Sequence, residues 1–397
     1  MRSKNFKRLS LLLAVMLISS VFHITTYAGQ GSFTKVIYGD RYYKIYVPST
    51  YNGETEVPLM VMLHGGDQDP DKFATGTKMN EIAELKNFIV LYPDQPAKAN
   101  QNKFWNWFEA AHQRRGSGEP AIIAGMIGEV KNTYNIDDNK VYVAGLSAGG
   151  AMSVILGVTY PDIIKGVGIA SGLEYKAATS MSGAFMAMNM GGPDSNTQGI
   201  LAYNEMAKYT ASPMPTIVFH GNSDYIVQKV NGNQVLSQWA QTNDMLDDGQ
   251  DNNSINDTPN TTESKTVEGG RTYTVYSYKD GQGNILMQKY LVDGMGHAWS
   301  GGSSLGNYTD SKGPDASKIM WGFLSGDSFD DGEPEEPEEP ENPSVEVAYG
   351  TATEHYVARR LDTSGYLEMG TKYGYIAKFY LYRLEGTNKW TDVKPIE

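Results

Sequence analysis

The chain contains no cysteine among its 397 residues. This absence excludes a disulfide framework, a thiol nucleophile and thiolate metal ligands. With 40% hydrophobic residues, the chain is long and apolar enough to bury a sizeable core without such cross-links. Its length is compatible with two domains.

Positive charge is also scarce, since 33 lysines and arginines face 46 acidic residues and the formal net charge is −13. A protein this acidic is a poor partner for nucleic acid, whose phosphates require basic side chains. We therefore expect no nucleic-acid partner and attribute the charge to solubility.

Long hydrophobic runs are missing except near the start. Residues 1–28 combine the basic residues Arg2, Lys4, Lys7 and Arg8, an apolar stretch over 9–21, and a small residue at Ala28. This pattern predicts a cleaved secretory signal peptide and a secreted, extracellular protein. The apolar stretch is too short to favour a transmembrane anchor, and no later segment is predicted to span a membrane.

Residues 29–329 are predicted to form one α/β domain. Short apolar strands alternate with helical patterns there, which favours a mostly parallel sheet with helices on both faces. Predicted strands cover 33–38, 41–47, 58–63, 88–91, 141–144, 164–170, 215–219, 271–278 and 286–292. Predicted helices cover 71–86, 120–134, 151–160, 230–240 and 314–325.

Residues 243–266 are polar and rich in Asn, Asp and Thr, which predicts a long surface loop. Its acidic residues lack the spacing of a calcium-binding EF-hand loop. We therefore expect no metal there and no cofactor elsewhere.

The end of the chain has a different composition. Residues 330–343 (DDGEPEEPEEPENP) predict a stiff, self-repelling linker. Residues 344–397 are rich in aromatics and glycines, and 375–383 alternate as a strand does. We predict a small all-β module there, with substrate binding as its candidate role.

One short segment organises the chemistry. Gly145-Leu146-Ser147-Ala148-Gly149-Gly150 separates a strand pattern from a helix pattern and fits the nucleophile elbow G-x-S-x-G. A Cβ at Gly145 or Gly149 would crowd so sharp a turn. Ser147 is thus the predicted nucleophile, although an incidental serine in a tight turn remains an alternative.

A serine nucleophile needs a base, and the chain has only six histidines. In elbow enzymes the order is Ser, then acid, then His. His297, in a glycine-rich loop after the last strand, fits this order best. His220 fits a buried structural role better. The remaining histidines are His23, His64, His112 and His355.

The acid that orients the base should follow a strand between serine and histidine. Asp224 fits, because it follows the 215–219 strand. Asp293 is the competitor, although it lies only four residues before His297. For the oxyanion we expect the N–H groups of Ala148 and of Gly66, which follows the 58–63 strand.

These segments resemble the secreted esterase family of polyhydroxybutyrate depolymerases, which also includes feruloyl and acetylxylan esterases. The resemblance covers 33–325. It rests on LHGGDQ (63–68), YPDQ (92–95), FWNWF (104–108), GLSAGGAM (145–152), GLEYKAAT (172–179), FHGNSD (219–224) and GMGHAWSGG (294–302). It implies an α/β-hydrolase fold and a serine triad, and it supports Ser147, Asp224 and His297.

The chain departs from the family pattern at two places. Many members carry cysteines where this chain has Gly66 and Phe104, and a proline where it has Ser300. The first change removes a disulfide that those members often have, which could loosen the oxyanion loop. Neither change touches the predicted triad.

The predicted substrate-binding residues are His64, Trp105, Trp107 and Trp299. Of the tryptophans Trp105 and Trp107, we expect one to line a subsite and the other to pack in the core. The methionines at 181, 186, 188 and 190 either flank an apolar cleft or fill the core.

The sequence therefore predicts an extracellular serine esterase that needs no cofactor. Its substrate would be a polyhydroxyalkanoate polyester or, alternatively, a plant-wall polysaccharide bearing feruloyl or acetyl esters. A non-catalytic polymer-binding protein is the alternative of another class, which a missing triad member would have favoured.

Overall fold

The computed structural model describes residues 31–209, 211–327, 345–373, 378–384 and 390–391. The chain divides into two compact units between Asp327 and Ser328. The predicted signal peptide (1–28) and linker (330–343) lie outside the described residues and stay predictions. Within those residues, no helix has the length and apolarity needed to cross a membrane.

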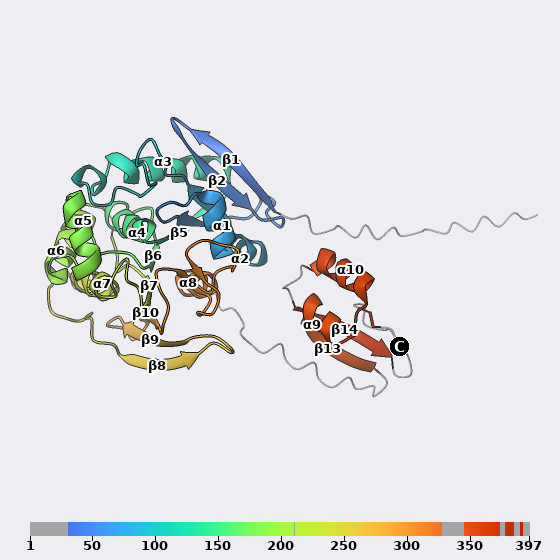
Figure 1. Ribbon diagram of the computed structural model, residues 1–397. Coiled ribbons are helices and arrows are strands. Elements are labelled where there is room, and N and C mark those ends of the chain that lie inside the picture. Colours follow the sequence, from blue (N-terminus) through green and yellow to red (C-terminus); the bar gives the residue numbers. More distant parts are fainter. Residues whose placement is uncertain (1–30, 210, 328–344, 374–377, 385–389, 392–397) are drawn as a thin grey trace, which may run out of the picture. The chain divides into compact units, whose positions relative to one another are not determined.

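The first unit is built on a ten-stranded sheet in the order β1-β2-β4-β3-β5-β6-β7-β10-β9-β8 (Figure 1). The run from β4 to β10 is parallel, and antiparallel strands flank it at both edges. The strands are β1 Ser32–Tyr38, β2 Arg41–Val47, β3 Val57–Leu63, β4 Ile89–Pro93, β5 Ile136–Leu146, β6 Gly166–Ala170, β7 Thr216–Gly221, β8 Thr261–Thr266, β9 Thr272–Lys279 and β10 Ile285–Val292. A separate pair joins β11 Trp299–Ser300 and β12 Thr309–Asp310. The mostly parallel sheet confirms the predicted fold class.

Helices cover both faces of this sheet. They are α1 Pro70–Thr77, α2 Met79–Lys86, α3 Gly118–Thr133, α4 Ala148–Thr159, α5 Met181–Met190, α6 Ser195–Met206, α7 Val230–Asp248 and α8 Ala316–Ser325, with a short 3-10 helix at Ala110–His112. Strand β6 shows the two layers, because Gly166 and Gly168 face α8 while Val167 packs against Gly157 of α4. Successive strand residues point to opposite faces, so α4 and α8 lie on opposite sides.

The apolar strand segments are buried, as the sequence predicts for strands covered on both faces. In β3, the residues Leu59 to Leu63 have no measurable exposure, and β4 and β6 are buried throughout. Parallel strands end at one common edge. The loops that follow β3, β5, β7 and β10 therefore meet at that edge, and these loops carry the predicted site residues.

One predicted helix and one predicted loop differ from the structure. The helix predicted over 71–86 is broken at Lys78, which adopts a left-handed conformation between α1 and α2. The segment predicted as a loop over 243–266 instead contains the end of α7, a connection over 249–260 and β8. Asn243 and Asp244 are buried because Asn243 bonds the Met214 backbone, and Asp244 accepts hydrogen bonds from the backbone at 252–255.

The second unit is not all-β, so that prediction is wrong. Its described part pairs β13 Val345–Thr351 with β14 Lys378–Leu384 and adds two helices, α9 Ala352–Val357 and α10 Thr363–Tyr373. Gly365 and Gly370 are typical turn residues in a small β module, but here both lie within α10. The helix forms because Tyr366 and Met369, three residues apart, share one face and pack with Leu381.

Candidate active site

Ser147 occupies a sharp turn between β5 and α4. Its backbone has φ 57° and ψ −120°, a conformation that residues with side chains rarely adopt. A Cβ on Gly145 would collide with the Gly149 backbone, and one on Gly149 with the Leu63 carbonyl oxygen. The glycines therefore have the steric role that the sequence analysis assigned to them. The Ser147 N–H donates to Ala170 O over 2.8 Å, which ties the turn to β6.

His297 and Asp224 are hydrogen-bonded to each other. The distance from His297 Nδ1 to Asp224 Oδ2 is 2.8 Å, and both side chains are nearly fully buried. The other carboxylate oxygen of Asp224 accepts the backbone N–H groups of Ile226 and Val227. Burial alone would raise the pKa of Asp224, but the hydrogen bond and charge of His297, with smaller contributions from His220 and Val227, lower it below its ordinary value. The carboxylate is therefore ionised and holds the imidazole in one orientation.

The alternative base, His220, lies next to Asp224, with 3.6 Å between its Nε2 and Asp224 Oδ2, whereas the alternative acid, Asp293, lies at the surface. Asp293 is exposed and accepts a hydrogen bond from Asn222 Nδ2. His220 is buried, and its Nε2 lies 2.8 Å from Val227 O, so this nitrogen donates. Burial is the main cause that lowers the pKa of His220. His220 is thus a neutral histidine beneath the acid loop, consistent with a structural role.

Ser147 borders two cavities. The larger, about 190 Å³, is also lined by His297, Gly66, Ile226 and Tyr308. The smaller, about 60 Å³, is apolar and lies on the Ala148 side, enclosed by residues that include Trp107, Phe108 and Leu173. The structure therefore brings Ser147 and His297, which are far apart in the sequence, to one space. The side chains of Phe104 and Met188 border both cavities.

Two backbone N–H groups near Ser147 are free to bind an anion. Ala148 is the first residue of α4, where the helix supplies no acceptor for its N–H. Gly66 lies in the turn after β3 and lines the larger cavity. A Cβ at Gly66 would collide with the ring of Phe104, so only glycine fits here. Negative charge is favoured at the N-terminus of α4.

Three of the four residues predicted to bind substrate lie in the core instead. His64 is 1% exposed, and its Nε2 accepts the Gln95 backbone N–H. Trp105 is equally buried and donates its Nε1–H to His64 O. Trp299 has no measurable exposure, packs edge-on against Phe73 and donates to Ser317. These three side chains line neither cavity at Ser147. Their polar atoms instead form hydrogen bonds that connect neighbouring segments of the chain.

Trp107 does line the smaller cavity. Both tryptophans of the 104–108 segment are buried in the core, and of the two only Trp107 lines a cavity at Ser147. Met181 and Met188 also line that cavity, which confirms the cleft-flanking alternative for these two methionines. Sequence reasoning did not identify Leu173, Ile226 or Tyr308 as cavity residues, although Leu173 belongs to a segment that matches the family.

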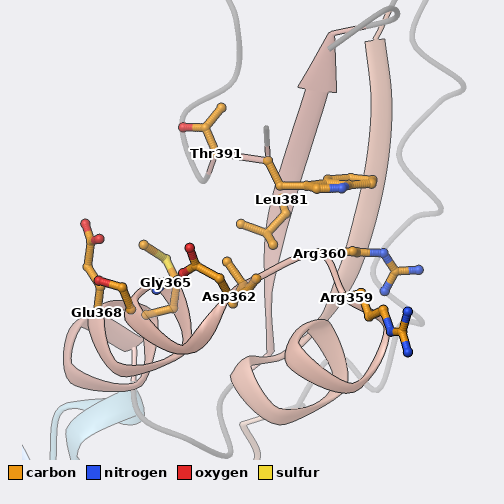
Figure 2. Close-up of a pocket in the computed structure, with 11 residues that line it drawn as sticks. Arg359, Arg360, Asp362, Gly365, Glu368, Leu381 and Thr391 are labelled. Carbon is orange, nitrogen blue, oxygen red and sulfur yellow. Dashed lines mark hydrogen bonds between the residues drawn. The ribbon is translucent and has the colours of Figure 1, made fainter. Parts of the chain in front are cut away.

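A separate pocket of about 560 Å³ lies in the second unit. Figure 2 shows Arg359 and Arg360 on one side of it and the carboxylates of Asp362 and Glu368 on the other. Trp390, which is partly buried, also lines it, and its ring lies 5.6 Å from the Arg360 guanidinium. The pocket mixes charges of both signs with one aromatic surface.

Over the described ranges, no group of three or more His, Asp or Glu side chains is arranged to hold a metal ion. What the structure gathers at the sheet edge is a serine, a histidine, a carboxylate and two backbone N–H groups. These are the parts needed for acyl transfer through a serine nucleophile.

Comparison with known proteins agrees with this chemistry. The family model described as "Esterase PHB depolymerase" matches residues 41–259. Poly(3-hydroxyalkanoate) depolymerase C of Paucimonas lemoignei is 32% identical over 361 residues, covering 84% of this chain and 83% of that protein. A poly(3-hydroxybutyrate) depolymerase of Ralstonia pickettii is 26% identical, covering 66% of this chain and 52% of that protein.

Polysaccharide esterases are similar over a shorter part of the chain. A probable acetylxylan esterase A of Neosartorya fischeri is 27% identical, covering 64% of this chain and 65% of that protein. Among solved structures, an acetyl xylan esterase from Aspergillus awamori superimposes with a TM-score of 0.55 at 21% identity, covering 67% of this chain and 94% of that one. At that identity the structural match shows the fold, which is that of the α/β-hydrolases.

Proposed function

Since this chain belongs to the esterase family of PHB depolymerases and is a carboxylic ester hydrolase, we propose that Ser147, His297 and Asp224 are its catalytic triad and that its substrate is a polyhydroxyalkanoate polyester. The observation that carries the triad is the 2.8 Å hydrogen bond between His297 and Asp224, next to a cavity that Ser147 and His297 both line.

In the proposed reaction, Ser147 Oγ attacks the ester carbonyl while its proton passes to His297 Nε2. Asp224 binds the Nδ1 proton, so Nε2 is the nitrogen left to accept one. The oxyanion forms against the N–H groups of Ala148 and Gly66. The alcohol then leaves with the proton from His297, and an acyl-enzyme remains on Ser147.

Water completes the cycle. His297 takes a proton from a water molecule, and the hydroxide attacks the acyl carbonyl. The second tetrahedral intermediate collapses, Ser147 recovers its proton from His297, and the acid is released. No cofactor enters these steps.

The two cavities suit the two halves of the ester. Because His297 protonates the leaving alcohol, we assign the larger cavity, which it lines, to the alcohol side of the polymer. The smaller apolar cavity beside Ala148 then holds the acyl unit. A space of about 60 Å³ suits a short acyl unit with a small side chain.

Two further parts of the proposal come from the sequence. The 1–28 pattern supports export to the extracellular space. The second unit is proposed to hold the enzyme on the insoluble polymer, which raises the effective concentration of ester at the active site. Its pocket, lined by Trp390 and by charges of both signs, supports a binding role.

Hydrolysis of p-nitrophenyl butyrate and of polyhydroxybutyrate film by wild type and Ser147→Ala tests this function. Wild type should act on both substrates, and the variant should keep only a small residual because the covalent route is lost. If the variant retains more than roughly a tenth of wild-type kcat, Ser147 is not the nucleophile.

Release of ferulate or acetate from plant-wall polysaccharide, without action on the film, would favour the alternative substrate class. A folded wild type without ester turnover would indicate a binding protein.

A further inference from the structure

Helix α5 exposes its large apolar side chains and buries small ones. The residues that it buries are the small Ala184 and Ala187, and it contacts α7. Large apolar side chains point to solvent instead: Met181 is 50% exposed, Phe185 61%, Met186 64% and Met190 76%. A surface helix of a soluble protein normally turns such residues inward. We call these four residues the α5 apolar face.

This face carries no charge. Residues 177–193, which contain the whole of α5, include no Asp, Glu, Lys or Arg. In a chain with 20% charged residues, an exposed helix without any charge is a surface suited to an uncharged partner. The same helix lies at the periphery of the first unit, where a flat partner can approach it (Figure 1).

The α5 apolar face is continuous with the active site. Met181 and Phe185 belong to the face and also line the apolar cavity next to Ser147. The helix is fixed to the loop of the proposed catalytic acid, because the Gln228 N–H donates to Met188 O over 2.8 Å. That loop adds two exposed apolar residues, Tyr225 at 79% and Ile226 at 47%, and Ile226 lines the larger cavity.

From these observations we propose that the α5 apolar face is an adsorption surface by which the first unit itself lies on a solid, uncharged aliphatic polyester, with the cavity at Ser147 directed at the polymer. The inference rests on the proposed function and adds to it a second, independent contact with the polymer. Methionine suits this role because its flexible, polarisable side chain adapts to an irregular apolar surface.

The chemistry of the face favours a polyester over a polysaccharide. A sugar polymer requires hydrogen-bond donors and acceptors and flat aromatic rings for stacking. The α5 apolar face offers three methionines and one phenylalanine, which gain free energy only by leaving water. An aliphatic polyester surface removes them from water without demanding polar contacts.

The test compares two double variants of the full chain. Met186→Ser with Met190→Ser removes the two face residues that line neither cavity. Ile37→Ser with Leu85→Ser is the matched control, since these side chains are 68% and 70% exposed on β1 and α2. Each is assayed for p-nitrophenyl butyrate hydrolysis and for initial hydrolysis of polyhydroxybutyrate film at low enzyme concentration. Adsorption to film is measured in the Ser147→Ala background.

We expect the face variant to keep wild-type kcat/KM on the soluble ester while film adsorption and film hydrolysis fall about tenfold, because two large apolar contacts are lost. The control should match wild type in all assays. Unchanged film hydrolysis in the face variant, or an equal loss in the control, overturns the proposal. So does a parallel loss on the soluble ester, which would indicate a role in shaping the site.

Two further measurements distinguish a polyester from other partners that could cover the α5 apolar face. If wild type is a dimer in solution and the face variant is a monomer, the face joins two copies of the chain and the proposal is wrong. An equal loss on acetylated xylan contradicts the commitment to polyester. Failure of the proposed function itself looks different, because wild type would then hydrolyse no polyester film.

Discussion

The ring of Phe104 lies directly against the backbone of Gly66, in the space that a Cβ of residue 66 would occupy. These are the two positions at which the family resemblance places cysteines in many members. Here an aromatic ring packed on a glycine connects the proposed oxyanion loop to the 104–108 segment. Trp105 strengthens the connection, because its indole N–H donates to His64 O, two residues before Gly66. The expected loosening of this loop is therefore offset by packing.

The Gly66 contact gives the first prediction. Gly66→Ala should lower kcat on p-nitrophenyl butyrate by about 10²-fold or more, because the clash with Phe104 moves an oxyanion N–H. Gly128→Ala on α3 is the control, since a Cβ there meets nothing. Adding Phe104→Ala to Gly66→Ala should restore part of kcat by making room. Wild-type kcat in the single variant would remove Gly66 from the oxyanion site.

The second prediction separates the two acids. Asp224→Asn should lower kcat by roughly 10⁴-fold, because an amide favours the wrong tautomer of His297. Asp293→Asn should cost little, since Asp293 is exposed and bonded to Asn222. Steady-state kinetics and circular dichroism of both variants check this. The reverse ranking in folded proteins would transfer the role to Asp293.

The third prediction concerns acyl selectivity. Leu173 is buried and lines the smaller cavity, so Leu173→Ala should raise the ratio of kcat/KM for p-nitrophenyl hexanoate over acetate by about tenfold or more. Leu236→Ala on α7 is the control, because Leu236 is equally buried and lines neither cavity. Both variants should lose about 2–5 kcal/mol of stability. An identical selectivity ratio in the two would show that this cavity does not hold the acyl unit.

The elbow and the acid–base pair could be predicted from sequence because their requirements are local. Gly145 and Gly149 are fixed by contacts within a few residues of Ser147 or with the neighbouring strand β3. The order of strands along the chain then places Asp224 and His297 at the same sheet edge. Neither step needs knowledge of the core.

Other features depend on contacts that the sequence pattern does not show. Asn243 and Asp244 look like loop residues, yet they are buried by hydrogen bonds to Met214 and to the 252–255 backbone. Trp299 lies in a segment that matches the family, but the hydroxyl that holds it belongs to Ser317 on α8. The sequence shows the α5 segment only as an apolar stretch. Its apolar side chains are so numerous that the pattern does not show which of them are buried and which are exposed.

The fourth prediction concerns the second unit. A chain ending at Asp330 should fold and keep full activity on p-nitrophenyl butyrate, because the proposed triad and both cavities lie before residue 327. It should act more slowly on polyhydroxybutyrate film. A fragment of residues 344–397 should bind polymer granules in a pull-down. If film hydrolysis is unchanged and the fragment binds no granules, the second unit does not direct the enzyme to the polymer. The assignment as an esterase would not be affected. The sequence offers four aromatic side chains of this unit for contact with a polymer: Tyr366, Tyr373, Tyr380 and Trp390. Tyr366 and Trp390 are partly buried, and the side chains of Tyr373 and Tyr380 lie outside the described part.

The last prediction is a pH dependence of stability that comes from Glu174. This side chain is 2% exposed and lies against Gly192, in the connection between α5 and α6. Both carboxyl oxygens of Glu174 are buried without a hydrogen-bond partner. Burial, with a smaller contribution from the charge of Asp194, raises the pKa of Glu174 to about 7, and the nearby Ser195 side chain opposes this only in part.

The direction in which stability changes with pH follows from the number of protons that the folded and unfolded states bind. Between the ordinary pKa of 4.5 and about 7, the folded state holds a proton on Glu174 that the unfolded chain has lost. Stability is therefore fully present below the ordinary pKa, falls as pH rises through this window and levels off above it. Glu174→Gln should match wild type near pH 4.5 and be more stable at pH 8, by up to about 3 kcal/mol. Thermal unfolding at both pH values checks this, with the exposed Glu268→Gln as control. If the Gln variant has the same melting temperature as wild type at pH 8, folding does not raise the pKa of Glu174.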